Sequence, residues 1–317
     1  MGRLAYPQGR SMKRTVLALA LFFVGTLAFG QIAVSGSVES GAQMVTDASG
    51  TQVRQYDWNE GYAGWGQIIL NAKLGDDASA FVYLRTTDLT SISLAYIWAT
   101  QKYFKGTLEL RAGNMYSCIF MTPYEGFNGI DGQGIQAVYK FPFGLTVGGF
   151  IPVTTAFKDI SSVYSGYKVG ASFTKGFLSV LGTYTGNGNF TASASATVEG
   201  LWAGIETQYT KATDNYYFCP YLDYTTKDQK FEFTMDCWTD NKDLILNSTT
   251  SLYFNYWFVP EFRVLGMVAY VPAGNTVKVR EGFVVKPFKS ASLRVQNETA
   301  FGSTLTNTVN IMMVHDF

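Results

Sequence analysis

The chain is poor in charge and in the residues that most often catalyse reactions or bind metals. Only 15% of its 317 residues are charged, and it contains one histidine and three cysteines. Soluble domains usually carry about 25% charged residues, so a soluble enzyme is a poor fit. A histidine-based catalytic site would have to use His315, close to the chain end, and a metal site would need carboxylates alone. We therefore expect no enzymatic activity, no catalytic residue, no metal and no cofactor.

Long apolar runs are also missing beyond residue 30. A membrane-spanning helix needs about 18 or more such residues in succession. Nevertheless, 47% of the residues are hydrophobic, 16% are aromatic, and there are 32 glycines. Abundant but finely divided apolar residues are typical of the strands of a membrane β-barrel, in which every second residue faces lipid and the others face a polar lumen.

The N-terminal residues predict export. Lys13 and Arg14 precede the apolar stretch 16–27, and small residues occupy the peptidase-recognition positions Ala28 and Gly30. This pattern is typical of a secretory signal peptide. We expect residues 1–30 to be removed and residues 31–317 to form one domain. Residues 1–30 contain four basic and no acidic side chains, so the remaining chain is net acidic, and we expect no nucleic-acid partner.

Period-two alternation predicts the strands. In residues 32–44 the even positions are apolar or small, whereas Ser35, Glu39 and Gln43 lie on the odd positions. Tight turns test this pattern, because two residues that pair across a turn must lie on the same face of the sheet. Across two of the turns we expect Val198 to pair with Leu201, and Phe173 to pair with Leu178. The pattern gives eighteen strands near 32–45, 62–74, 78–86, 90–101, 107–113, 134–141, 145–151, 166–174, 177–185, 190–198, 201–210, 216–225, 230–238, 248–258, 262–270, 277–286, 291–299 and 305–317.

The predicted fold is an all-β, transmembrane, antiparallel up-and-down β-barrel of eighteen strands, with sixteen as the alternative count. Four connections on one side are long: 46–61, 114–133, 152–165 and 239–247. Those on the other side have mostly two to five residues. Short periplasmic turns and longer external loops are the asymmetry of an outer-membrane barrel. Within this pattern Phe81 and Tyr83 face the lumen, and Glu281 faces lipid.

Two segments resemble known outer-membrane proteins. The last strand alternates apolar residues and ends on Phe317, which resembles the signal read by the outer-membrane assembly machinery, although His315 departs from it. Residues 108–114, with Arg111-Ala112-Gly113, and residues 134–150 resemble the fifth to seventh strands of the general porins of Gram-negative outer membranes. The resemblance covers about 45 residues. It implies that loop 114–133 folds inward to narrow a pore, and it favours a homotrimer.

Charged residues on the inward positions form separate groups. The predicted constriction residues are Lys73, Arg85, Arg111, Glu125, Asp131, Arg263, Arg280 and Arg294. An acidic wall is predicted across the barrel from the basic groups, formed by Glu206, Asp223, Glu232 and Asp236. We expect the loop that carries Glu125 and Asp131 to fold toward the basic side. Opposed charges of this kind orient polar solutes and tune ion preference; the alternative is that these are ordinary solvated lumen residues.

Aromatic residues on the lumen positions leave a second channel type open. Sugar-selective channels such as the maltoporins stack sugar rings on a lumenal row of aromatic side chains. The alternative is that the aromatics lie at strand ends or contact inward-folded loops. The residues concerned are Trp65, Phe81, Tyr83, Phe150, Trp202, Tyr217, Tyr221, Tyr253 and Trp257.

Cys219 and Cys237 flank one turn, but the alternation places them on opposite faces. A disulfide between them is therefore not expected, and Cys118 lies in the predicted constriction loop. The sequence predicts a porin of the bacterial outer membrane that lets small hydrophilic solutes and ions diffuse through it. Its partners would be outer-membrane lipids, the assembly machinery and those solutes. The alternatives are a maltoporin-like sugar channel and a surface adhesin or structural protein without a channel.

Overall fold

The computed structural model describes residues 31–55, 65–86, 92–116, 119–124, 126–127, 130, 132–153, 166–239 and 248–317. The predicted signal peptide 1–30, and Glu125, Asp131 and Cys118, lie outside the described residues. Within the described part, no helix is long and apolar enough to span a membrane.

The described chain is almost entirely β-strand, interrupted by two short 3-10 turns at Phe104–Gly106 and Pro272–Gly274. The strands are β1 (Gln31–Asp47), β2 (Gly50–Gln55), β3 (Trp65–Lys73), β4 (Ala78–Thr86), β5 (Ser93–Tyr103), β6 (Leu108–Met115), β7 (Gly132–Lys140), β8 (Leu145–Pro152), β9 (Lys168–Lys175), β10 (Leu178–Thr185), β11 (Phe190–Val198), β12 (Leu201–Thr210), β13 (Asn215–Thr225), β14 (Phe231–Thr239), β15 (Ser248–Val259), β16 (Phe262–Val271), β17 (Thr276–Phe288), β18 (Ala291–Phe301) and β19 (Thr306–Asp316).

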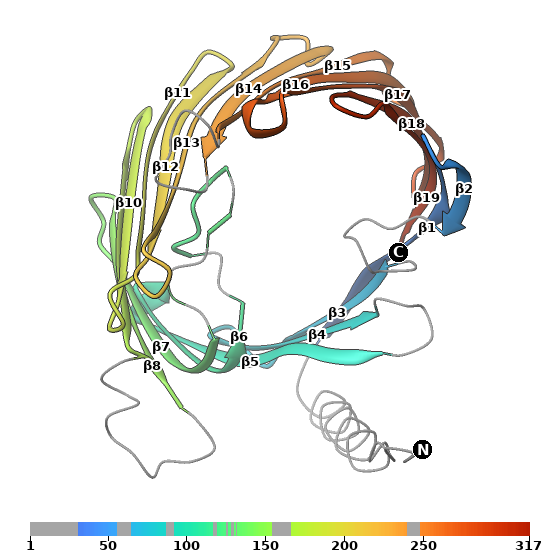
Figure 1. Ribbon diagram of the computed structural model, residues 1–317. Helices are drawn as coiled ribbons and strands as arrows, with labels where there is room; N and C mark the ends of the chain where they lie inside the picture. The colour runs from blue at the N-terminus through green and yellow to red at the C-terminus, as the bar shows by residue number, and fades with distance from the viewer. Residues whose placement is uncertain are drawn as a thin grey trace, which may run out of the picture.

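These strands close into one antiparallel ring, in which β1 pairs with β19 (Figure 1). β2 and β3 share one position, because β2 pairs with the second part of β1 and β3 with the first part. The barrel therefore has 18 strand positions, which confirms the predicted count over the alternative of sixteen. Closure pairs β1 with β19, so the ring does not end in two free edge strands; a bilayer would require this, because an unsatisfied backbone group is costly in lipid.

β2 corrects one predicted connection. The sequence pattern assigned residues 46–61 to a loop, but residues 50–55 fold back onto β1 and pair with residues 42–47. Val53 is the one apolar side chain on the outward positions of this strand, so its alternation was too weak to identify it. On the inward side, Arg54 Nε donates a 2.6 Å hydrogen bond to Gln43 Oε1.

The short turns set the register. Glu199 and Gly200 both have positive φ, the conformation that a two-residue hairpin turn requires, and Val198 pairs with Leu201 as predicted. The predicted pair of Phe173 with Leu178 was wrong. Leu178 pairs with Lys175, and Phe173 pairs with Val180, because the turn lies one residue further along the chain than its sequence suggested. Each residue still faces the predicted side, because each partner differs from the predicted one by two residues, which is one full repeat of the strand.

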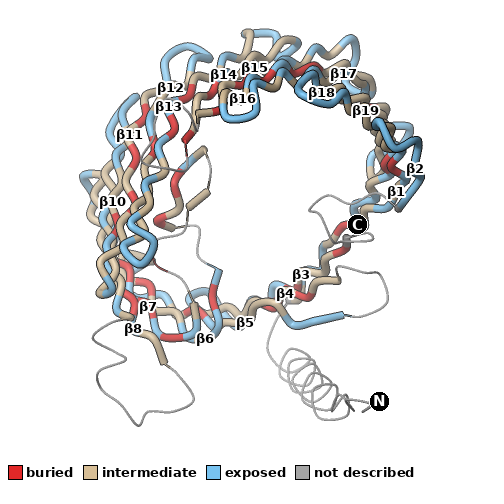
Figure 2. Tube along the Cα trace, in the orientation of Figure 1, coloured by how far each residue is buried: buried red, intermediate tan, exposed pale blue. Residues whose placement is uncertain are grey.

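Burial alternates along the strands, as β7 illustrates with exposed Ile135 and Ala137 between the buried residues Gly134, Gln136 and Val138 (Figure 2). Exposed apolar side chains continue around the outside of the ring, for example Val34, Ile151 and Leu252. This exterior is what a membrane-spanning barrel presents to lipid. Phe81 and Tyr83 face inward, where they stack on Trp98 and Tyr96, and Glu281 faces outward beside Asn297, as predicted.

Candidate functional site: the barrel interior and the loop between β6 and β7

The strand register places basic side chains on the inner face in two sectors. The first includes Lys73 on β3, Arg85 on β4 and Arg111 on β6. The second, on β16 to β18, contains Arg263, Arg280 and Arg294. These side chains lie on the inward positions, yet the Arg280 side chain is 36% exposed. Lys73, the last residue of β3, contacts Asp76 in the connection to β4. The interior around Arg280 is therefore not filled by side chains, as the interior of a small barrel would be.

The acidic residues occupy β12 to β14 on the same inner face. Glu206 lies on β12, Asp223 on β13, and Glu232 and Asp236 on β14. A single strand, β15, separates them from the basic sector on β16 to β18. The acidic strands β12 to β14 lie across the ring from β3 and β4, but close to β16 to β18 on the same side (Figure 1).

Several of these charges are paired within the wall itself. Arg111 Nε lies 2.5 Å from Glu109 Oε1, and Lys140 Nζ lies 3.9 Å from the other oxygen of Glu109. Arg280 contacts Glu298 across the β17–β18 pair at 2.5 Å. Sequence reasoning did not select Glu109 and Glu298. Both have the inward alternation, and the strand register would have identified them as partners.

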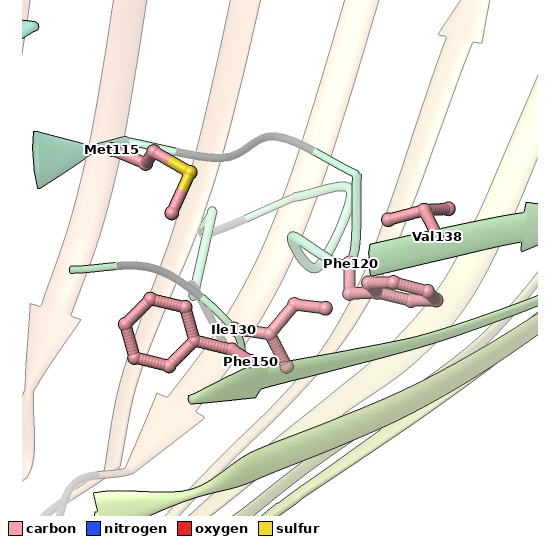
Figure 3. Close-up of a cluster of buried hydrophobic side chains, with 5 residues drawn as sticks. All are labelled: Met115, Phe120, Ile130, Val138 and Phe150. Carbon is pink, nitrogen blue, oxygen red and sulfur yellow. The ribbon is translucent and has the colours of Figure 1, made fainter. Parts of the chain in front are cut away.

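The loop between β6 and β7 begins and ends in an apolar cluster against the inner wall. The cluster contains five almost fully buried side chains, drawn in Figure 3: Met115, Phe120, Ile130, Val138 and Phe150. Phe120 lies over two glycines of the wall: a Cβ atom at Gly148 would be 2.6 Å from its ring, and one at Gly170 would be 3.0 Å away. Glycine at these two positions leaves the space into which the ring fits.

The same loop reaches the acidic residues of β12 and β14. The backbone N–H of Tyr124 donates a 2.5 Å hydrogen bond to Glu206 Oε1, and the Tyr124 hydroxyl donates a 2.6 Å bond to Asp236 Oδ2. Glu206 is fully buried and Asp236 nearly so. The described part of the loop, green and inside the ring in Figure 1, therefore contacts the acidic residues. The prediction that the loop folds toward the basic side was wrong for this part.

Burial, together with the hydrogen bond to Asp236, raises the pKa of Tyr124 well above its ordinary value. The phenol therefore stays protonated at physiological pH and remains a hydrogen-bond donor. The protonated phenol supplies a donor to one oxygen of the buried carboxylate, Asp236 Oδ2, without adding charge.

Aromatic residues of the wall meet aromatic residues of the loop. The Tyr124 ring is stacked on Tyr221, with centroids 4.5 Å apart and planes inclined by 6°, and Trp202 lies 4.7 Å from the same Tyr221 ring. Phe127 meets Tyr217 edge-on at 4.6 Å. These contacts match the alternative that lumen aromatics contact an inward-folded loop. Phe81 and Trp98 on β4 and β5 form a separate stack at 3.9 Å.

The C-terminal residue lies at the closure of the barrel. Gly36 N donates to Phe317 O at 2.9 Å, and Phe317 N donates to Gly36 O at 3.0 Å. A Cβ atom at Gly36 would lie 2.5 Å from the Phe317 ring, so the ring covers this glycine. Phe317 and His315 both face outward, the latter beside Val38.

No group of three or more histidine, cysteine or acidic side chains within the described part of the chain is arranged to hold a metal ion. Cys219 is buried on the inner face and Cys237 lies on the outer face, and no disulfide joins them, as predicted.

Comparisons with known proteins agree on the fold. No protein-family model and no curated protein matches the chain. Among solved structures, two variants of the Rhodopseudomonas blastica porin superpose with a TM-score of 0.56 at 12% sequence identity, and cover 90% of this chain and 100% of theirs. A structure described as "Asymmetric conductivity of engineered proteins" matches with the same TM-score and coverage at 13% identity. The chain is therefore a closed 18-strand β-barrel with the porin fold.

Proposed function

We propose that the protein is a diffusion channel of the bacterial outer membrane for small hydrophilic solutes and ions. One observation carries this proposal: Arg280 lies on the inward positions of the closed barrel, and its charged side chain remains accessible to solvent. Charges in a filled interior would be costly to desolvate, whereas a water-filled lumen keeps them hydrated.

The exterior supports the proposed location. Exposed aliphatic and aromatic side chains surround the barrel, which suits outer-membrane lipids as the surrounding medium. Export by the signal peptide 1–30, recognition of Phe317 by the assembly machinery and assembly into a homotrimer belong to the same proposal.

The loop between β6 and β7 would narrow the channel on one side. Its cluster around Phe120 holds it to β7, β8 and β9, and Tyr124 holds it to β12 and β14. The passage would then lie between the loop and the wall formed by β16 to β19 and β1 to β5. Arg85, Arg263 and Arg294 would line it, while Glu206 and Asp236 would be covered by the loop.

Liposome swelling tests the channel directly. Purified protein reconstituted in liposomes should admit small sugars and amino acids and should exclude large oligosaccharides. Planar bilayers should show discrete conductance steps under the same conditions. A protein that migrates as a folded, heat-modifiable barrel but gives neither swelling nor conductance would contradict the proposal and would favour the adhesin or structural alternative.

A sugar-selective channel is the second candidate. The stack of Phe81 on Trp98 favours it, because paired aromatic faces are suited to sugar rings. The burial of Tyr221 under Tyr124 disfavours it, because that part of the aromatic surface is already occupied. Maltodextrin added to a planar bilayer separates the two: a general channel should show no saturable block of its conductance.

A further inference from the structure

A basic cavity opens on the inner wall where β16, β17, β18, β19 and β1 lie side by side, next to the β17–β18 turn. Its volume is about 230 Å³. Its charged lining comprises four cations and two carboxylates: Arg263, Lys286, Lys289, Arg294, Glu39 and Asp316. Val284 and Met312 contribute an apolar floor. The cavity therefore carries an excess of positive charge and is separate from the contacts of the β6–β7 loop.

Two arginines face each other across one residue of this cavity. Arg263 pairs with Val284, and Val284 pairs with Arg294, so both arginines flank Val284 on the inner face. Adjacent strands are about 4.8 Å apart, so two arginine side chains can reach a common ligand between them. Neither guanidinium forms an ion pair with a carboxylate of the described chain. Because both positive charges lie beside Val284 on the same face, they repel each other.

Arg263 is held in an orientation that suits anion binding. Its guanidinium carbon lies 5.3 Å from the centre of the Trp257 ring, so one face of the group is occupied. Its Nε is buried and has no hydrogen-bond partner among the described residues. A buried donor without an acceptor is costly. An oxyanion would supply the acceptor and would relieve the repulsion between the two arginines.

We propose that this cavity binds a small oxyanion, a free phosphate or carboxylate group, between Arg263 and Arg294. The proposal rests on the channel function proposed above, because the anion would reach the cavity through the lumen. Lys286 and Lys289 add to the attraction from the β17 side. Glu39 and Asp316 repel an anion from the β1–β19 side and thereby confine it to the arginines.

Inorganic phosphate is the probe for this site. In planar bilayers the chloride conductance of the full protein should fall saturably as phosphate is added. Replacing both arginines, Arg263→Gln with Arg294→Gln, should raise the apparent dissociation constant for phosphate by about tenfold or more, because each arginine provides charge-assisted hydrogen bonds. The matched control is Lys140→Gln, which removes a half-exposed lumen cation outside the cavity and should leave phosphate inhibition unchanged.

Acetate tests whether the site also binds a carboxylate. Inhibition by both anions supports a general oxyanion site, and inhibition by phosphate alone supports a phosphate site.

Equilibrium binding separates this proposal from the channel proposal. Phosphorus NMR of phosphate with the folded protein in detergent should show line broadening that the double variant loses. Broadening without conductance supports the site and contradicts the channel. Conductance with no saturable phosphate effect, or with the same effect in the double variant, overturns the site and leaves the channel intact. If the double variant does not fold, Arg294→Lys takes its place, since lysine keeps the charge but loses two-point binding of an oxyanion; unchanged phosphate affinity in that variant overturns the proposal.

Discussion

The hydroxyl of Tyr124 donates a 2.6 Å hydrogen bond to Asp236, 112 residues further along the chain. The bond joins the loop between β6 and β7 to β14, and the Tyr124 ring is stacked on Tyr221 beside it. A carboxylate that would otherwise face the lumen is thereby buried by the loop. The loop position and the charge of the lumen are therefore coupled through one side chain.

Removing this hydrogen bond should loosen the loop. Tyr124→Phe keeps the stacked ring but removes the hydrogen bond to Asp236 Oδ2, which we expect to cost about 1–3 kcal/mol. Single-channel conductance should rise, and cation preference should increase as Asp236 becomes exposed to the lumen. Tyr256→Phe, on the outer face, is the control and should behave as the native protein. Unchanged conductance and selectivity in Tyr124→Phe would show that the loop is held by its other contacts alone.

The same phenol predicts a dependence on alkaline pH. Burial and the bond to Asp236 raise the pKa of Tyr124, whereas an unfolded tyrosine titrates near pH 10. Its contribution to stability is therefore complete below about pH 10 and is lost as the pH rises from there toward the higher pKa of the folded state. Conductance should stay constant from neutral pH to about pH 10 and increase above it. Tyr124→Phe should lack this increase; an identical alkaline rise in both proteins would exclude Tyr124 as its source.

The packing of Phe120 against Gly148 and Gly170 predicts the effect of a larger residue at Gly148. Gly148→Ala would bring a methyl group to 2.6 Å from the Phe120 ring, so the ring must move. We expect a loss of about 1–3 kcal/mol in the free energy of unfolding, measured by urea titration of the detergent-folded barrel. Gly182→Ala is a matched control, because no atom lies within 4 Å of the added methyl group. Equal stability of the two variants would contradict the packing account.

Arg85 offers the clearest test of the constriction charges. Arg111 is tied to Glu109, so its replacement would also leave a buried carboxylate without its partner. We expect Arg85→Ala to shift the reversal potential toward cation preference, because it removes one inward positive charge opposite the acidic strands. Lys175→Ala, at the last residue of β9 and on its outward positions, should produce little shift. No shift in Arg85→Ala would assign Arg85 to the ordinary solvated wall.

Phe317 should matter for assembly as well as closure. Its ring covers Gly36 at the β1–β19 junction, and its backbone closes two hydrogen bonds there. Phe317→Ala should lower the yield of heat-modifiable barrel in the outer membrane several-fold. Phe301→Ala, an exposed aromatic on neighbouring β18, should have a smaller effect. Equal yields of both variants would contradict a special role for the terminal residue.

The sequence determined every strand except β2, the faces of these strands and the number of strand positions in the barrel. An alternating strand in a barrel has one apolar and one polar side, so the pattern in residues 32–44 is visible without knowledge of its partners. The same parity separated Cys219 from Cys237 and placed Glu281 outside. It missed β2, whose outward face has one apolar residue. It also misplaced the partner of Phe173, because the position of a turn depends on backbone angles, and glycine allows the required angles at more than one position.

Only the tertiary structure decided where the loop goes and which charges meet. Alternation states that Glu206, Asp236 and Arg263 point inward, but not what covers them, because contacts across the lumen join residues that are distant in sequence. The attachment of Tyr124 to the acidic strands depends on the packing of Phe120 against Gly148 and Gly170 and on the stacking of Tyr124 on Tyr221. The alternation of apolar and polar residues along a strand reveals none of these contacts. The cavity between Arg263 and Arg294 likewise appears only when β17 places Val284 between them.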